Sequence, residues 1–140
     1  MKSRFFAVLA VAVIGAVLAL PLAAQTSVLT ANVPFEFNLA GKVMPAGAYQ
    51  FQINTSSAVL RLRNFAADTG AVSLGVPATL RSTNDAKIIF NRYGDTYFLS
   101  SVVDGYIGAG LQAPISKAER ELAKTASAQK YEILGVLARR

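Results

Sequence analysis

The chain has 140 residues, with 14 Lys and Arg against 8 Asp and Glu, and it contains no His and no Cys. These absences exclude disulfide bonds, Ser-His-Asp and Cys-His nucleophiles, thiol redox chemistry and the usual zinc or copper sites. We therefore expect no metal site and no cofactor.

The first residues have the pattern of a bacterial secretory signal. A basic start, Met1–Arg4, precedes an uncharged apolar run over residues 5–20, and Pro21 and small residues follow. This order is typical of a signal peptide. We expect cleavage after residues 1–24, with an exported chain that begins near Gln25 in the periplasm or outside the cell. The alternative is an uncleaved membrane anchor, because about 20 apolar residues can span a bilayer.

The remaining charge is unevenly placed along the chain. Residues 25–116 hold six basic and five acidic side chains, and residues 117–140 hold six basic and three acidic ones. A nucleic-acid-binding domain usually concentrates Lys and Arg on its folded surface. The nearly neutral body therefore argues against a nucleic-acid partner.

The body of the chain has the pattern of short β-strands separated by turns. Residues 33–39, 48–53 and 59–63 alternate between apolar and polar side chains, which predicts strands with one buried face. In the last segment Arg61 and Arg63 lie opposite the apolar face. We interpret these two arginines as a solvated face, or as protection against edge-to-edge aggregation.

The clearest local prediction is a β-hairpin over residues 87–99 with Gly94-Asp95 as its turn. In this register Arg92 faces Tyr97 and Phe90 faces Leu99. We take Arg92, Tyr93, Asp95 and Tyr97 as the candidate binding surface of the chain. The alternative interpretation is a hairpin that these residues merely stabilise by cross-strand pairing.

A helix is predicted over residues 117–126. Ser116 and Glu119 have the spacing of a capping box, in which the Ser116 hydroxyl accepts a hydrogen bond from the backbone N–H of Glu119. Ala118 and Leu122 form a narrow apolar stripe. We expect this stripe to pack on the sheet, because so short a helix is marginal alone.

These elements predict an all-β fold, a mainly antiparallel sandwich or flattened barrel of about six to eight strands with one C-terminal helix. The domain is expected to span residues 25–126. For residues 127–140 three interpretations remain open: an extension of the helix, a last strand, or a frayed and disordered tail.

The acidic residues of the body give weak support for catalysis. They are Glu36, Asp68, Asp85, Asp95 and Asp104. The four aspartates lie beside Gly, Asn or Thr, which is typical of turns. Hydrolysis of a glycan by carboxylates requires two acids placed in one pocket, and the sequence does not predict such a pair.

Three segments together resemble a group of small exported bacterial proteins of unknown function. They are residues 32–49 with VPFEF and PAGAY, residues 90–100 with FNRYGDTYFLS, and residues 116–123 with SKAERELA. The chain differs from that group over residues 103–112, where glycines replace a more polar loop. The resemblance implies export and a single β-rich domain, and it implies no chemistry.

We therefore expect a non-enzymatic binding or structural module of the cell envelope or extracellular space, with an envelope protein or a polysaccharide as its partner. One alternative is a carboxylate-dependent enzyme that acts on envelope glycans. The other is a small membrane-associated barrel or a signal-anchored protein.

Overall fold

The structure is a computed structural model, and it describes residues 26–79, 85–105 and 109–137. The expected signal segment, residues 1–24, lies outside the described residues. In the described part of the chain, no helix is long and apolar enough to cross a membrane. This part is mostly β, with one short helix near the C-terminus, which confirms the predicted fold class at that level.

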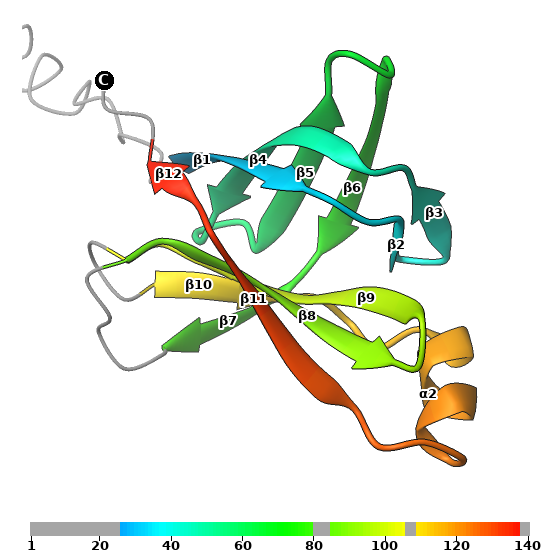
Figure 1. Ribbon diagram of the computed structural model, residues 1–140. Helices are drawn as coiled ribbons and strands as arrows, with labels where there is room; N and C mark the ends of the chain where they lie inside the picture. The colour runs from blue at the N-terminus through cyan, green and yellow to red at the C-terminus, as the bar shows by residue number, and fades with distance from the viewer. Residues whose placement is uncertain (1–25, 80–84, 106–108, 138–140) are drawn as a thin grey trace, which may run out of the picture.

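One sheet has five strands in the order β12-β1-β4-β5-β6, and all of its neighbours pair antiparallel (Figure 1). Its strands are β1 (Thr26–Val33), β4 (Gly47–Asn54), β5 (Val59–Asn64), β6 (Thr69–Leu74) and β12 (Val136–Leu137). We call it the five-stranded sheet.

The other sheet has seven strands, with the main order β11-β8-β9-β10-β7. Its strands are β2 (Phe37–Leu39), β3 (Lys42–Met44), β7 (Val76–Thr79), β8 (Lys87–Tyr93), β9 (Thr96–Val103), β10 (Ala109–Gln112) and β11 (Gln129–Leu134). The short strand β2 pairs with β3 and also lies parallel to β9. We call it the seven-stranded sheet.

The chain passes from one sheet to the other twice with almost no connecting loop. Gly75 alone separates β6 from β7, and its N–H donates to the carbonyl of Ala58 at 2.8 Å. Gly135 alone separates β11 from β12, and its N–H donates to the carbonyl of Ala86 at 2.9 Å. Each bend divides one extended segment of the chain into two strands. This is one reason why the described part of the chain has twelve strands and not the roughly six to eight expected.

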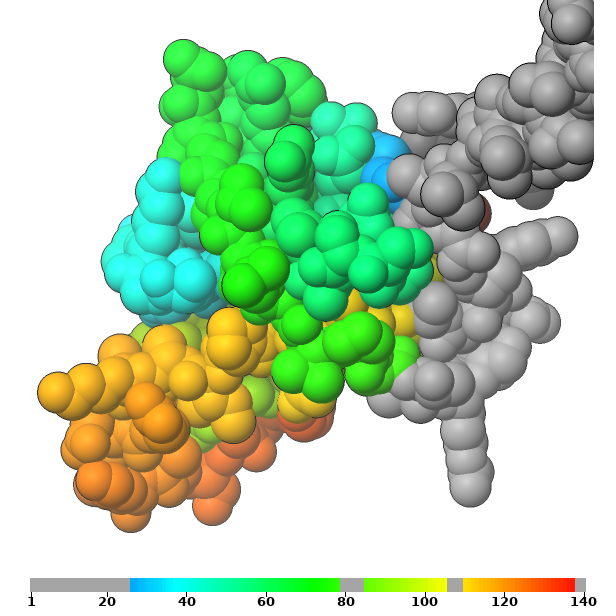
Figure 2. Space-filling model, turned by 180° about the vertical axis from the view of Figure 1, so that it is seen from behind, coloured from blue at the N-terminus to red at the C-terminus, as the bar shows by residue number. Residues whose placement is uncertain are grey.

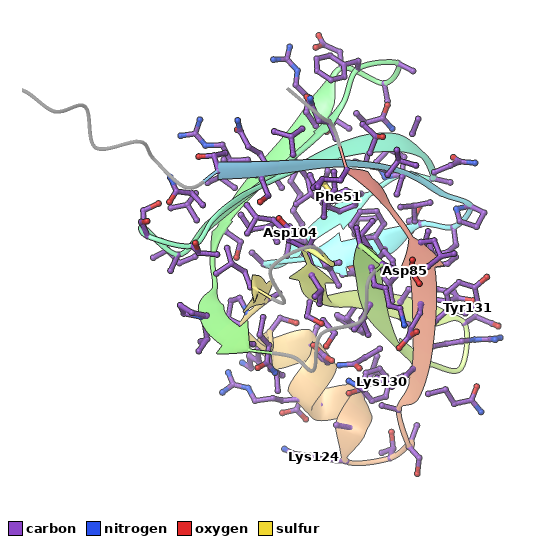
Figure 3. All side chains as sticks on the ribbon, turned by 90° about the vertical axis from the view of Figure 1, so that its left-hand side faces the viewer. Phe51, Asp85, Asp104, Lys124, Lys130 and Tyr131 are labelled. Atoms are coloured by element: carbon purple, nitrogen blue, oxygen red, sulfur yellow. The ribbon has the colours of Figure 1, made fainter. Side chains whose placement is uncertain are left out.

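One hydrophobic core fills the space between the two sheets. Alternation along β4 turns Tyr49, Phe51 and Ile53 inward, as the sequence predicted, and Phe51 is fully buried (Figure 3). The predicted strand over residues 33–39 is interrupted, because β1 ends at Val33 and β2 begins two residues after Phe35. The break follows from Pro34, which has no N–H to donate to a ladder.

Pro45, Ala46 and Gly47 predict a turn before β4 from the sequence, and the chain does bend there. Gly47 has a φ of +153°, and a side chain at this position would meet the Asn64 amide nitrogen at 2.6 Å. Glycine is therefore required for both the backbone angle and the space. The hydroxyl of Tyr49 donates to the carbonyl of Pro45 and fixes the turn to the strand that follows it.

The predicted hairpin is confirmed in its register. Strands β8 and β9 pair antiparallel with Arg92 opposite Tyr97 and Phe90 opposite Leu99. Gly94 has a φ of +60° in the connecting turn. The sequence was informative here because Gly at the first turn position matches the twist of a two-residue hairpin.

The helix α2 (Lys117–Ala123) is shorter than predicted. Ser116 is its N-cap, and the Ser116 hydroxyl accepts from the backbone N–H of Glu119 at 3.2 Å, as expected. The predicted buried stripe is wrong, because Ala118 is exposed and Leu122 only half-buried. Glu119 is the buried residue of this helix, since its carboxylate finds hydrogen-bond donors on the sheet.

The segment after the helix belongs to the fold. Residues 129–134 form β11, which pairs with β8 along its whole length, and residues 136–137 form β12, which pairs with β1. The boundary expected at residue 126 therefore does not separate a body from a tail. Alternation alone could not reveal this strand, because five of its six side chains are exposed.

Candidate functional site

Three hollows lie side by side on the outer face of the five-stranded sheet. The largest has a volume of about 570 Å³ and is lined by Arg61, Arg63 and Phe65. A second, of about 250 Å³, shares Gln52 and Arg61 with the first. A third, of about 470 Å³, shares Gln50 and Phe65 with it. Because neighbouring hollows share lining residues, we treat them as one depression, the sheet trough.

The strand register builds the centre of the trough from two matched pairs. Gln50 lies opposite Arg63 and Gln52 lies opposite Arg61 across β4 and β5. All four side chains point outward, because the residues that alternate with them, such as Phe51, are buried in the core. Each arginine therefore lies opposite a glutamine on the neighbouring strand, on the same outer face.

The two arginines of the trough have no acidic partner among residues 26–79, 85–105 and 109–137. The guanidinium of Arg63 lies 4.9 Å from the ring centroid of Phe65, a cation–π contact that holds the ring at the rim. Phe65 is 62% exposed. Asp68 is the one acid among the residues that line the three hollows. The trough therefore combines unpaired positive charge with amides and an aromatic ring.

One edge of the trough is lined by a glycine, Gly70. Gly70 on β6 lies opposite Arg63, and a side chain at Gly70 would meet the carbonyl oxygen of Leu62 at 2.7 Å. The Nζ of Lys42, from β3, donates to the carbonyl of Gly70 at 2.6 Å. A side chain at Gly70 therefore has no room, and the Lys42 contact ties β3 to this edge of the trough. The turn between β5 and β6, in green, and the helix α2, in orange, lie at opposite ends of the face seen in Figure 2.

Three of the four residues predicted as a binding surface lie together at the β8–β9 turn. The Nε of Arg92 donates to the carbonyl of Gly94 at 2.6 Å, and its guanidinium lies 3.8 Å from a carboxylate oxygen of Asp95. The guanidinium carbon is 5.5 Å from the ring centroid of Tyr97. Arg92, which the predicted register placed opposite Tyr97, therefore makes a cation–π contact with its ring. These mutual contacts are also what a hairpin stabilised by its own side chains requires.

Tyr93 does not belong to that surface, which corrects the prediction. Successive residues of a strand point to opposite faces, so Tyr93 points away from Arg92. Its ring is 9% exposed and packs edge-on against Phe98, with the ring centroids 5.8 Å apart. Its hydroxyl donates to the carboxylate of Glu119 at 3.2 Å.

Two aromatic residues of the hairpin cluster were missed by the sequence analysis. The ring of Phe35 stacks on that of Tyr97 with centroids 3.7 Å apart. Tyr131 contacts both rings edge-on, at 5.3 and 6.0 Å, and lies at the surface of β11 (Figure 3). Their contribution could not be predicted, because the break after Val33 was not expected and a last strand was only one of three interpretations left open for residues 127–140.

Beneath the helix, a buried carboxylate joins three elements. Glu119 of α2 is 3% exposed and accepts hydrogen bonds from the Asn91 amide at 2.9 Å and from the Tyr93 hydroxyl. Lys130 of β11 donates to the same Asn91 side chain at 2.7 Å. This network fastens the helix to the outer face of the seven-stranded sheet. Its Tyr93–Glu119 bond is buried and gives a structural role to Tyr93, whereas the Lys130–Asn91 bond is exposed.

The network predicts a loss of stability at alkaline pH. Burial is the main cause that raises the pKa of Tyr93, and the negative charge of Glu119 and the hydrogen bond to Glu119 raise it further. Burial also raises the pKa of Tyr49. Above pH of about 10 an unfolded chain loses phenolic protons that the folded chain keeps. The folded state then binds more protons, so the free energy of unfolding should fall as pH rises.

The measurement is urea unfolding at several pH values between about 8 and 11. The variants Tyr93→Phe and Tyr49→Phe should each reduce the alkaline slope. The exposed Tyr131→Phe variant should keep it, because both buried phenols remain. An unchanged slope in Tyr93→Phe would contradict the assignment.

The acids of the body are mostly exposed. Glu36, Asp68, Asp85 and Asp95 are exposed, whereas Asp104 is 5% exposed and accepts a hydrogen bond from the Ser27 hydroxyl. Asp68 has a φ of +47° in its turn, a conformation that Asp tolerates better than most residues. In the described ranges, no group of three or more acidic side chains could hold a metal ion.

Comparisons with models of protein families, with curated proteins and with solved structures give no match to this chain. Function is therefore inferred from the geometry of its own residues. The sequence held a usable signal for the trough. A hairpin of residues 48–53 and 59–63 across the polar loop between them would have placed Gln50 and Gln52 beside the two arginines.

Proposed function

We propose that this protein is a non-catalytic binding module of the bacterial cell envelope or the extracellular space, and that its ligand lies in the sheet trough. The observation that supports this proposal is the continuity of the three hollows across one sheet face, with Arg61 and Arg63 unpaired at their centre. Ligand sites are typically concave surfaces with a few polar groups that converge.

The chemistry of the trough supports binding in preference to hydrolysis. A glycan hydrolase of the usual kind needs two carboxyl groups that flank the scissile bond. The trough offers Asp68 alone. In this proposal the two sheets and their direct connections form a flattened barrel, a scaffold rigid enough to present a preformed surface.

Retention by envelope fractions tests the proposal. The chain, purified in the processed form that a bacterial host gives it, is passed over immobilised envelope extract, peptidoglycan and polysaccharide. We expect retention of the parent chain and its loss in the double variant Gln52→Ala/Arg61→Ala. The matched control Gln112→Ala/Arg120→Ala changes exposed residues of the same types away from the trough and should be retained.

Equal retention of the two double variants would show that the trough is not the binding surface. A parent chain that no fraction retains would contradict the proposal itself. Thermal unfolding of each variant, followed by circular dichroism, distinguishes loss of binding from loss of the fold.

Export makes a separate prediction about the start of the protein. If residues 1–24 are a cleaved signal, the exported chain begins within a few residues of Gln25. Intact-mass spectrometry of the protein recovered from the periplasm or medium measures this directly. A membrane-bound chain that still begins at Met1 would favour the uncleaved anchor.

A further inference from the structure

We propose that the ligand of the sheet trough is a carboxylate-bearing polysaccharide, an inference that rests on the proposed function. The first step is the charge. Arg61 and Arg63 are exposed and have no acidic partner within the described ranges, so an anionic group on a ligand would meet them without displacing an existing ion pair. Arg is the side chain best suited to bind a planar carboxylate through two parallel hydrogen bonds.

The second step is the spacing. The two arginines are two residues apart on one strand, which separates their backbone positions by about 7 Å. Two guanidinium groups carried by positions this far apart on one face fit a ligand with repeated carboxylates better than a single small acid. The trough continues beyond both arginines, toward Asn54 on one side and Leu134 on the other, so it has room for a chain of several units.

The third step is the pair of glutamine carboxamides, whose hydrogen-bonding groups favour a ligand that bears hydroxyls. Gln50 and Gln52 lie directly beside the arginines, and each carboxamide offers both a donor and an acceptor. Sugar hydroxyls need both kinds of partner, whereas a polyphosphate or polyglutamate chain supplies acceptors at its charged groups and no hydroxyl donors. The exposed ring of Phe65 adds a flat apolar surface at the rim, on which the C–H face of a sugar can pack.

The experiment uses polygalacturonate as the probe, a polymer of sugars that each carry one carboxylate. Its methyl-esterified form is the neutral control, and polyglutamate and polyphosphate are the charged controls without sugar hydroxyls. Affinity electrophoresis or calorimetry measures binding to the processed chain. We expect binding to polygalacturonate and a weakening of at least about tenfold on esterification, since each lost charge-assisted hydrogen bond is worth about this factor.

The double variant Arg61→Gln/Arg63→Gln should weaken binding to polygalacturonate by at least about tenfold. The matched control Lys117→Gln/Arg120→Gln removes the same charge at exposed positions outside the trough and should stay within about twofold of the parent chain. Equal weakening of both variants would mean non-specific attraction of charge and would overturn the inference.

Other outcomes distinguish this inference from the proposed function. Equally tight binding of polyglutamate or polyphosphate, still lost in Arg61→Gln/Arg63→Gln, would overturn the sugar ligand and leave the trough as the site. Failure to bind any of the four probes would also overturn the polysaccharide, while the proposed function would still stand on retention by envelope extract. A chain that binds none of the probes and is not retained by envelope extract would overturn both the polysaccharide ligand and the proposed function.

Discussion

Replacing Phe90 by Ala is expected to lower the free energy of unfolding by about 3–5 kcal/mol. The Phe90 ring is fully buried between the two sheets and packs edge-on against Phe35 and Phe37, with centroids 5.0 and 5.3 Å apart. Its removal leaves a cavity where β2, the hairpin and β11 meet. Urea unfolding measures the change, which would consume a large part of the stability typical of a domain this size.

Phe65→Ala is the matched control, because it deletes the same side chain at an exposed position. Its effect on unfolding should be within about 0.5 kcal/mol. The same variant should weaken binding in the trough. If Phe65→Ala and Phe90→Ala destabilise the chain equally, the assignment of core and surface is wrong.

Replacing Glu119 by Leu is expected to lower the free energy of unfolding by about 3 kcal/mol, because one buried and one half-buried donor would lose their acceptor. The donors are the Asn91 amide and the Tyr93 hydroxyl. Because Leu has a volume similar to that of Glu, the decrease in the free energy of unfolding would come from the lost hydrogen bonds and not from a cavity. The helix is short and depends on docking, so its amides should also exchange with solvent faster.

Glu121→Leu is the control on the same helix. Glu121 is exposed, and its contact with Lys124 at 3.1 Å is an exposed ion pair of small energetic value. We expect a change within about 1 kcal/mol. A loss as large as that of Glu119→Leu would mean that any charge on this helix matters, and that the buried network is not what holds it.

The elements that could be predicted from the sequence are those whose signal is local. Alternation identified the inward residues of β4 and β5, and Gly94 with Asp95 fixed the hairpin register. Ser116 was correctly placed as the N-cap, because the capping interaction spans only three residues.

What failed depends on partners that are distant along the chain. Glu119 is buried because Asn91 and Tyr93, more than 25 residues away, donate to it. The helix pattern alone placed Ala118 and Leu122 against the sheet instead. The exposed strand β11 has no apolar alternation and is held by pairing with β8. Arg92, Asp95 and Tyr97, which the sequence analysis selected, lie together at the hairpin but outside the trough. Arg61 and Arg63 were placed on an outer strand face but were not selected as a binding surface.

The central claim is that a ligand lies on the outer face of the five-stranded sheet, and hydroxyl-radical footprinting tests it most directly. Two samples of the processed chain are oxidised, one free in solution and one bound to the envelope fraction that retains it. Mass spectrometry then identifies the labelled side chains in each sample. Phe65 and Val72 in the trough, and Tyr131 and Ile115 outside it, are all well exposed in the free chain. We predict that Phe65 and Val72 become protected while Tyr131 and Ile115 do not. Protection of Tyr131 with Phe65 unchanged would contradict the account and move the site to the hairpin cluster.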